Sequence, residues 1–328
     1  MEQRRFSGKG HWYHETQSNH AQSDALPLVP EAANVDDRFL LDLALPDEIV
    51  AACSGWLTPA RALCHQLFPL SLPVNRLRTL SAYDRLSTAL TVAQACGVQR
   101  LCNHYAALLA PLPGPDSSRE SNRRLAQITQ YARQLASSPD VIDDKARNQL
   151  DEVGLSTYDI VVINQIIGFI GFQARVVAVF QALLGHPVRW LPGHHIQPHA
   201  LPACAGRWIA LLPVVELRYA SAQQLESLSR WQAEPALEAL TPVLCHEPTL
   251  LDLTGEILLN SRAEIPQTSP ALSAAVELLT RSPDRFSAAQ FTPLTDQGLQ
   301  GEYAITLLTQ SAFDGWLNRL KVAFGKEE

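Results

Sequence analysis

The chain has 328 residues, of which 46% are hydrophobic and 18% charged, and its formal net charge is −7. This composition is typical of a globular protein with a sizeable core and excludes a disordered chain. The excess of acidic residues argues against nucleic acid or an anionic membrane as the main partner, because both bind basic surfaces. We therefore expect a globular protein that binds neither.

Residues 1–35 are polar and rich in His, Gln, Asn and Ser. Two early arginines are not followed by an apolar segment, so this stretch does not resemble a signal peptide. The six cysteines lie far apart, unlike the disulfide framework of a small secreted domain. These features predict a flexible N-terminal arm over residues 1–35 and a cytoplasmic location.

Helical signals begin at residue 36. Asp47 can start one helix, and Thr58-Pro59 can start the next. Residues 80–112 predict two helices that meet at Gly97. Further helices are expected at residues 123–139 and over Asp140 to Val153, where Gly154 would end the second of them.

Residues 155–185 form the most apolar part of the chain and are apolar on all sides of a helix. Such a segment is typical of a central, buried helix. It contains Asn164, Gln165, Gln173 and Arg175, which a membrane span would tolerate poorly. We therefore predict that this helix is buried in the protein and does not cross a membrane.

A Pro- and His-rich stretch, residues 186–220, is the best candidate for a linker between domains. Within it, residues 207–220 could form a strand or an extended linker, because periodicity does not decide between them. Residues 221–328 again carry helical signals, and strand signals are few. The sequence predicts an all-α fold.

Three windows of the sequence superimpose without gaps: residues 80–101, 155–176 and 299–320. The first two begin with Leu-Ser-x-Tyr-Asp, and all three carry an arginine at the same offset: Arg100, Arg175 and Arg319. An arginine in an apolar helix needs a partner. We expect an ion pair with the repeated aspartates, Asp84 and Asp159; a substrate-binding role for the arginines is the alternative.

Two segments resemble the carboxymuconolactone decarboxylase and alkylhydroperoxidase D (AhpD)-like superfamily. LSTYDIVVINQIIGFIGFQARVV, together with the YARQLASSPDVIDDKARNQLDEVGLS before it, resembles the second half of a peroxidase-related domain of that family, and SAFDGWLNRLKVAFG resembles the end of a second such domain. The resemblance implies a duplicated helical bundle, with a first domain at residues 36–185 and a second, degenerate domain at 221–328. It also implies a homo-oligomer.

Active members of this superfamily have a glutamate followed by a Cys-x-x-Cys-x-x-x-His motif, whose two thiols reduce peroxide. The resemblance places His104 at the position of the family histidine. Counting back from it, Arg100 and Gly97 stand where the two cysteines should be. The glutamate position falls on Arg85, beside Asp84. The motif is therefore degenerate in this chain.

Cys96 and Cys102 flank the degenerate motif. A break in the helix at Gly97 could bring the two thiols within disulfide distance, and helix ends favour a reactive thiolate. The candidate catalytic residues are thus Cys96 and Cys102 as a dithiol, His104 as a general base and Asp84 as the group that orients it. The alternative is that both cysteines are core residues and that His104 is a satisfied helix histidine.

A second candidate site is the loop that contains His194, His195 and His199, with Cys204 close behind. Zinc or copper accepts such ligands. Pro198, however, prevents a regular helix across the three histidines, which favours an ordinary surface loop. We predict no metal and no cofactor.

Three functions follow from these features. The first is a peroxidase-related oxidoreductase with a small-molecule substrate, a peroxide or a thiol. The second is a non-catalytic binding or regulatory protein that retains the bundle, which the missing Cys-x-x-Cys motif suggests. The third is a metal-dependent enzyme that uses the histidine loop.

Overall fold

The computed structural model describes residues 28–69, 71–188, 196–197, 208–264, 269–299 and 301–327. Over these residues the fold is helical apart from one two-stranded antiparallel sheet, which confirms the all-α class. The elements up to the central helix are η2 (Pro30–Ala33), α1 (Asp47–Leu67), α2 (Ala82–Cys96), α3 (Gln99–Leu109), α4 (Arg119–Ser137), η3 (Pro139–Val141), α5 (Asp144–Glu152) and α6 (Thr157–Leu183).

The later elements are shorter, apart from the last helix. They are β1 (Trp208–Ala210), η4 (Leu217–Tyr219), α7 (Ala222–Trp231), α8 (Thr241–Leu244), α9 (Pro248–Asn260), α10 (Pro270–Arg281), η5 (Pro283–Arg285), η6 (Ala288–Gln290), α11 (Phe291–Asp296), α12 (Gly301–Phe324) and β2 (Gly325–Glu327). Strand β1 pairs with β2, so part of the predicted linker forms a strand.

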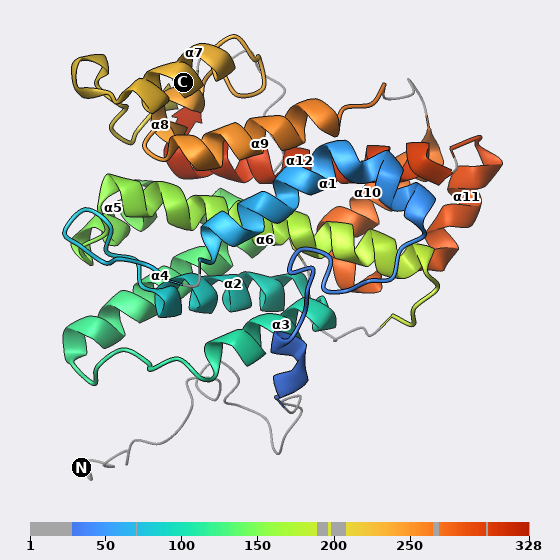
Figure 1. Cartoon of the computed structure of the whole chain (residues 1–328), viewed down its shortest axis with the longest axis horizontal. Helices are drawn as coiled ribbons and strands as arrows, with labels where there is room; N and C mark the ends of the chain where they lie inside the picture. The colour runs from blue at the N-terminus through green and yellow to red at the C-terminus, as the bar shows by residue number, and fades with distance from the viewer. Residues whose placement is uncertain are drawn as a thin grey trace.

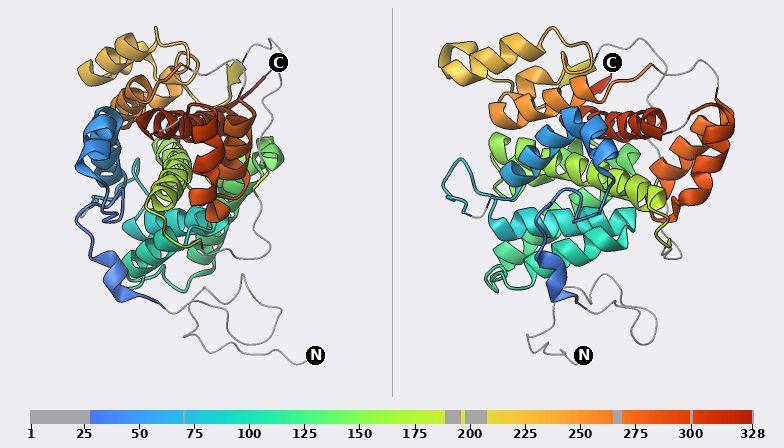
Figure 2. Two further views of the ribbon diagram at one scale, coloured as in Figure 1. Left: turned by 90° about the vertical axis from the view of Figure 1, so that its right-hand side faces the viewer. Right: turned by 45° about the vertical axis from the view of Figure 1, so that its right-hand side comes forward.

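Helix α6 lies at the centre of the bundle, as predicted. It packs against α2, α4, α10 and α12, which surround it in Figures 1 and 2. Helix α1 completes the enclosure, since Trp56 stacks on Phe180 with ring centroids 6.3 Å apart. Among the described helices, α6 alone is long and apolar enough to cross a membrane, but 89% of its most apolar window is buried inside the protein. The buried core helix of a globular protein meets the same criteria of length and hydropathy.

Helix α1 is a single helix, so the predicted break at Thr58-Pro59 is wrong. Pro59 lies inside it. A proline in a helix removes one hydrogen bond, but α1 packs along the whole of α9. Trp56, Leu57, Ala60 and Leu63 are buried on both sides of the proline, and this packing holds the helix together.

The second and third windows, which are 144 residues apart, have matching element boundaries in the structure. Helices α6 and α12 begin at equivalent positions, as do η3 and η5. Gly154 and Gly298, also 144 residues apart, end the preceding helices with φ of 82° and 78°. The segment of η6 and α11 corresponds to α5. The order of elements from η3 to α6 therefore recurs from η5 to α12. We call residues 36–185 the first half and residues 221–328 the second half.

The buried arginines of α6 and α12 make corresponding contacts across the two halves. Arg175 on α6 donates to the carbonyl of Thr280 at 2.8 Å, and Arg319 on α12 donates to the carbonyl of Ala136 at 3.0 Å. Under the 144-residue offset Arg319 corresponds to Arg175, and Thr280 corresponds to Ala136. Each arginine therefore binds a carbonyl of the other half. The helices of residues 36–185 and 221–328 contribute to one hydrophobic core.

The predicted ion pairs between the repeated aspartates and arginines are wrong. Asp159 and Arg175 lie sixteen residues apart on one straight helix, about 24 Å along its axis. The aspartates instead cap the helices on which they lie: Asp84 and Asp159 form capping boxes with Ser81 and Ser156. The buried arginines are satisfied by backbone carbonyls.

Candidate functional site

Cys96 is the last residue of α2 and lies at the junction predicted from the sequence. Gly97 follows in the left-handed conformation, with φ of 72°, and its amide bonds to the carbonyls of Ala93 and Gln94. This turn ends α2 and lets α3 begin at Gln99. The Cys96 side chain points into the core and is 2% exposed.

Two buried guanidinium groups lie near the Cys96 thiol. Burial raises the pKa of Cys96, while the charges of Arg175 and Arg319 and an interaction with the Arg175 guanidinium act in the opposite direction. Burial lowers the pKa of Arg175, and the pKa of Arg319 is lowered by burial and by Arg175 beside it. Cys96 is thus a buried thiol whose raised pKa is partly offset by the charges of two arginines, one from each half.

Asp284 of η5 lies against the junction from the second half. A Cβ atom built on Gly97 would come within 3.0 Å of the Asp284 Cβ, so only glycine fits here without displacement. A cavity of about 50 Å³ opens beside this contact and is lined by Gly97, Gln99, Gln181, His186 and Asp284, among others. One water needs roughly 15 Å³ of such space, so the cavity can hold a small molecule beside Gly97, but the buried Cys96 is not among the residues that line it.

Cys102 lies in the second turn of α3 and is partly exposed. Burial and then the charge of Cys96 raise its pKa to about 12, which places the two thiols within electrostatic reach of each other. Both are free thiols. The structure therefore brings Cys96 and Cys102 to the same junction.

His104 makes contacts that the sequence did not indicate. Its Nδ1 lies 2.7 Å from the carbonyl of Ala32, and its ring is perpendicular to that of Tyr105. Burial lowers the pKa of His104. The contact attaches residues 30–33, the described end of the predicted arm, to α3; residues 1–27 lie outside the described part of the chain.

Asp84 lies at the opposite end of α2, twelve residues before Cys96 and about 18 Å away along the helix. Its carboxylate accepts from the Ser81 amide at 3.0 Å and lies 3.5 Å from Arg124. The structure does not bring Asp84 and His104 together, because His104 is close to the turn of the α2–α3 hairpin and Asp84 is far from it.

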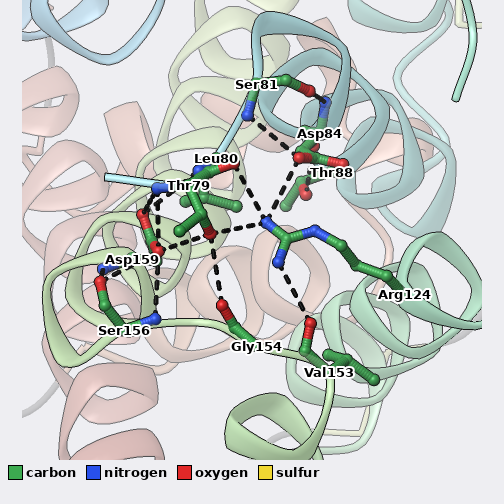
Figure 3. Close-up of polar contacts among 10 residues, drawn as sticks. All are labelled: Thr79, Leu80, Ser81, Asp84, Thr88, Arg124, Val153, Gly154, Ser156 and Asp159. Carbon is green, nitrogen blue, oxygen red and sulfur yellow. Dashed lines mark hydrogen bonds and ion pairs between the residues drawn. The ribbon is translucent and has the colours of Figure 1, made fainter. Parts of the chain in front are cut away.

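Asp84 belongs instead to a polar network that joins the N-termini of α2 and α6 (Figure 3). Asp159, which is 0% exposed, accepts hydrogen bonds from Thr79, Leu80 and Ser156. Arg124 reaches across to the hydroxyl of Thr79 at 2.9 Å. These bonds satisfy buried polar groups and position the N-termini of two helices.

The other described cysteines lack the paired cations. Burial raises the pKa of Cys53 and Cys245 to about 11 and that of Cys64 to about 12. Only Cys64 has an arginine nearby, Arg38, whose effect is offset in part by Asp37. Among the described thiols, Cys96 is the one that two guanidinium groups approach.

The histidine loop of the third hypothesis lies outside the described residues: His194, His195, His199 and Cys204 all fall there. Within the described ranges no group of three His, Cys, Asp or Glu residues could hold a metal ion.

The sequence pointed to Arg175 and Arg319 as repeated residues but not to their position beside Cys96. It missed Asp284 altogether. The available signal was a second repeat, Ser-Pro-Asp, which occurs at residues 138–140 and again at 282–284. The repeat marks equivalent turns in the two halves, and only the second of them meets Gly97.

A scan of protein-family models gives no match to this chain, and no curated protein matches its sequence.

Proposed function

We propose that this chain is a cytoplasmic, thiol-dependent oxidoreductase of the AhpD-like type, in which Cys96 reduces a small peroxide and Cys102 resolves the product. The observation that carries the proposal is that Cys96 and Cys102 lie on the two sides of the α2–α3 junction, where the charges of Arg175 and Arg319 oppose the effect of burial on the pKa of Cys96. Nearby cations favour a thiolate, which is the nucleophile. The sequence resemblance to the AhpD-like superfamily agrees with this chemistry and adds a homo-oligomer to the proposal.

The reaction needs two steps at Cys96. The thiolate attacks one peroxide oxygen, the O–O bond breaks, and Cys96 becomes a sulfenic acid while the leaving oxygen takes a proton to form water or an alcohol. The Cys102 thiolate then attacks the Cys96 sulfur, an S–S bond forms, and the sulfenic oxygen leaves as water. An external dithiol would supply the two electrons that restore both thiols.

The test is peroxide oxidation of the reduced protein, followed by mapping of its cysteines by mass spectrometry. We expect a Cys96–Cys102 disulfide to form before the other thiols react. Cys102→Ser should leave a sulfenic acid on Cys96 that dimedone traps, and Cys96→Ser should abolish peroxide consumption. Cys53→Ser is the matched control, because Cys53 is equally buried, at 2% exposure, but has no pair of cations beside it.

A second function, a non-catalytic binding or regulatory protein, is favoured by one observation: burial raises the pKa of all five described cysteines. In that case Cys96 fills the core beside two structural arginines. Slow oxidation of every cysteine at a similar rate, with no preference for Cys96, would refute the oxidoreductase and support this alternative.

A further inference from the structure

We propose that residues 211–219, a surface segment of the predicted linker, are the contact through which two copies of this chain form a two-fold dimer. We call these residues the exposed linker segment. The proposal goes beyond the thiol chemistry of the proposed function and does not depend on it. It gives the proposed homo-oligomer a defined contact surface.

The exposed linker segment presents several large apolar side chains to solvent. Leu211 is 39% exposed, Val214 46%, Leu217 61% and Tyr219 75%. All four lie within nine residues of the chain. Apolar side chains that gather on a surface in this way mark a site of interaction with another molecule.

The backbone of the segment is fixed by the rest of the fold. The amide of Leu211 bonds to the carbonyl of Phe324 at 2.8 Å. The amide of Val215 bonds to the carbonyl of Pro242 at 3.1 Å, and its side chain packs against the hydrophobic core. The segment then forms η4. Because this backbone is already ordered, association loses less conformational entropy than it would with a flexible loop.

Two charges of opposite sign flank Leu217 in the sequence. Glu216 precedes it and Arg218 follows it; their side chains are 60% and 71% exposed and lie 2.8 Å apart. A two-fold axis that passes close to Leu217 places Glu216 of each copy opposite Arg218 of the other. It also places the two Leu217 side chains against each other. The order of the charges is therefore self-complementary, as the contact between two identical surfaces requires.

This charge pattern favours a second copy over other occupants. An acidic partner would repel Glu216, and a basic partner would repel Arg218. A wholly apolar partner would bury the ion pair at a cost in desolvation. The same segment of a second copy presents both charges in the opposite order and matches each of them. The segment leads into α7, which lies at the outer edge of the molecule in Figures 1 and 2, where a second copy can approach.

The test is sedimentation of the full chain over a range of protein concentrations. We expect a dimer that dissociates on dilution. Glu216→Arg places like charges opposite each other twice in one interface, so the dissociation constant should rise about a hundredfold, and Arg218→Glu should have the same effect. The double variant, Glu216→Arg with Arg218→Glu, restores opposite charges across the axis. Its dissociation constant should return to within about tenfold of the natural value.

Leu217→Cys gives a covalent readout of the axis. A residue beside a two-fold axis faces the same residue of the other copy, and a disulfide needs Cα atoms within roughly 7 Å. Mild oxidation should therefore link two chains through residue 217, which peptide mass spectrometry identifies. Leu77→Cys is the matched control, because Leu77 is 72% exposed but lies on the loop between α1 and α2, and it should form no such link.

Three results would overturn the proposal. One is a natural chain that sediments as a monomer at every concentration, which would leave these side chains for a different protein or another segment of this chain. Another is a dimer that persists unchanged in both single charge variants. The third is a folded double variant that stays monomeric. None of these measurements uses peroxide, so the proposed function is judged separately, by the Cys96–Cys102 disulfide.

Discussion

The indole of Trp316 on α12 lies directly on the backbone of Gly168 on α6. A Cβ atom at residue 168 would come within 1.8 Å of the Trp316 Cδ1. Trp316 also meets Phe172, its equivalent in the first half, with ring centroids 5.8 Å apart. The two central helices of the two halves therefore depend on this glycine for their close approach.

We expect Gly168→Ala to destabilise the protein by about 3 kcal/mol, the upper end of the usual cost of overpacking. Urea unfolding followed by tryptophan fluorescence measures the change. Gly171→Ala is the control on the same helix, because its Cβ would meet only the end of the Arg175 side chain at 3.4 Å. Equal effects of the two substitutions would contradict the proposed packing.

We expect His104 to make the free energy of unfolding depend on pH. Burial lowers its pKa below the ordinary value of 6.5, so between these two pKa values the unfolded chain binds more protons than the folded one. Unfolding is then favoured as the pH falls. The contribution of His104 to the free energy of unfolding is complete above pH 6.5. It declines as the pH falls towards the pKa of His104 in the folded state, and it changes no further below that pKa.

The measurement compares unfolding free energies at pH 7.5 and 5.5. We expect His104→Gln to reduce the difference between them, because glutamine can still donate to the Ala32 carbonyl but does not titrate. His65→Gln is the control, since His65 lies on the exposed side of α1. If both variants keep the full pH dependence of the natural chain, His104 is not its source.

Asp159 holds the N-termini of α2 and α6 together. Its carboxylate accepts hydrogen bonds from the amide of Thr79 at 2.9 Å and from the hydroxyl of Thr79 at 2.7 Å. Asp159→Asn would turn an amide NH₂ towards these donors. We expect a loss of about 3 kcal/mol in urea unfolding, as for other buried charge-assisted networks that lose a partner. Asp84→Asn, at a less buried capping box, should cost clearly less.

The thiols should react faster in alkaline solution. The pKa of Cys96 is raised above its ordinary value of 9.0 and that of Cys102 to about 12, so at neutral pH each is mainly protonated. Because the thiolate is the reacting form, the rate of sulfenic acid formation on Cys96 should keep rising about tenfold per unit up to at least pH 9. A rate that levels off below pH 8, measured by dimedone trapping, would contradict this.

Much of the helical framework follows from the sequence. The apolar residues of α6 predict a central helix, since a helix apolar on every side must be surrounded. Gly97 and Gly154 predict helix ends, because a left-handed residue favours glycine. The 144-residue repeat is visible as matching windows. Local chemistry is sufficient for all of these.

The partners of the buried polar groups were decided only by the tertiary structure. The sequence placed Asp159 opposite Arg175 and Asp84 beside His104, yet Asp159 binds Thr79, and His104 binds Ala32. It also gave no indication that Arg319 and Asp284 lie beside Cys96. Such contacts join residues far apart in the sequence, as Arg319 and Ala136 show, and they depend on how the helices pack against one another. Spacing along one helix determines the face of the helix on which a residue lies. The residue that it contacts there is determined by how the other helices pack against that face.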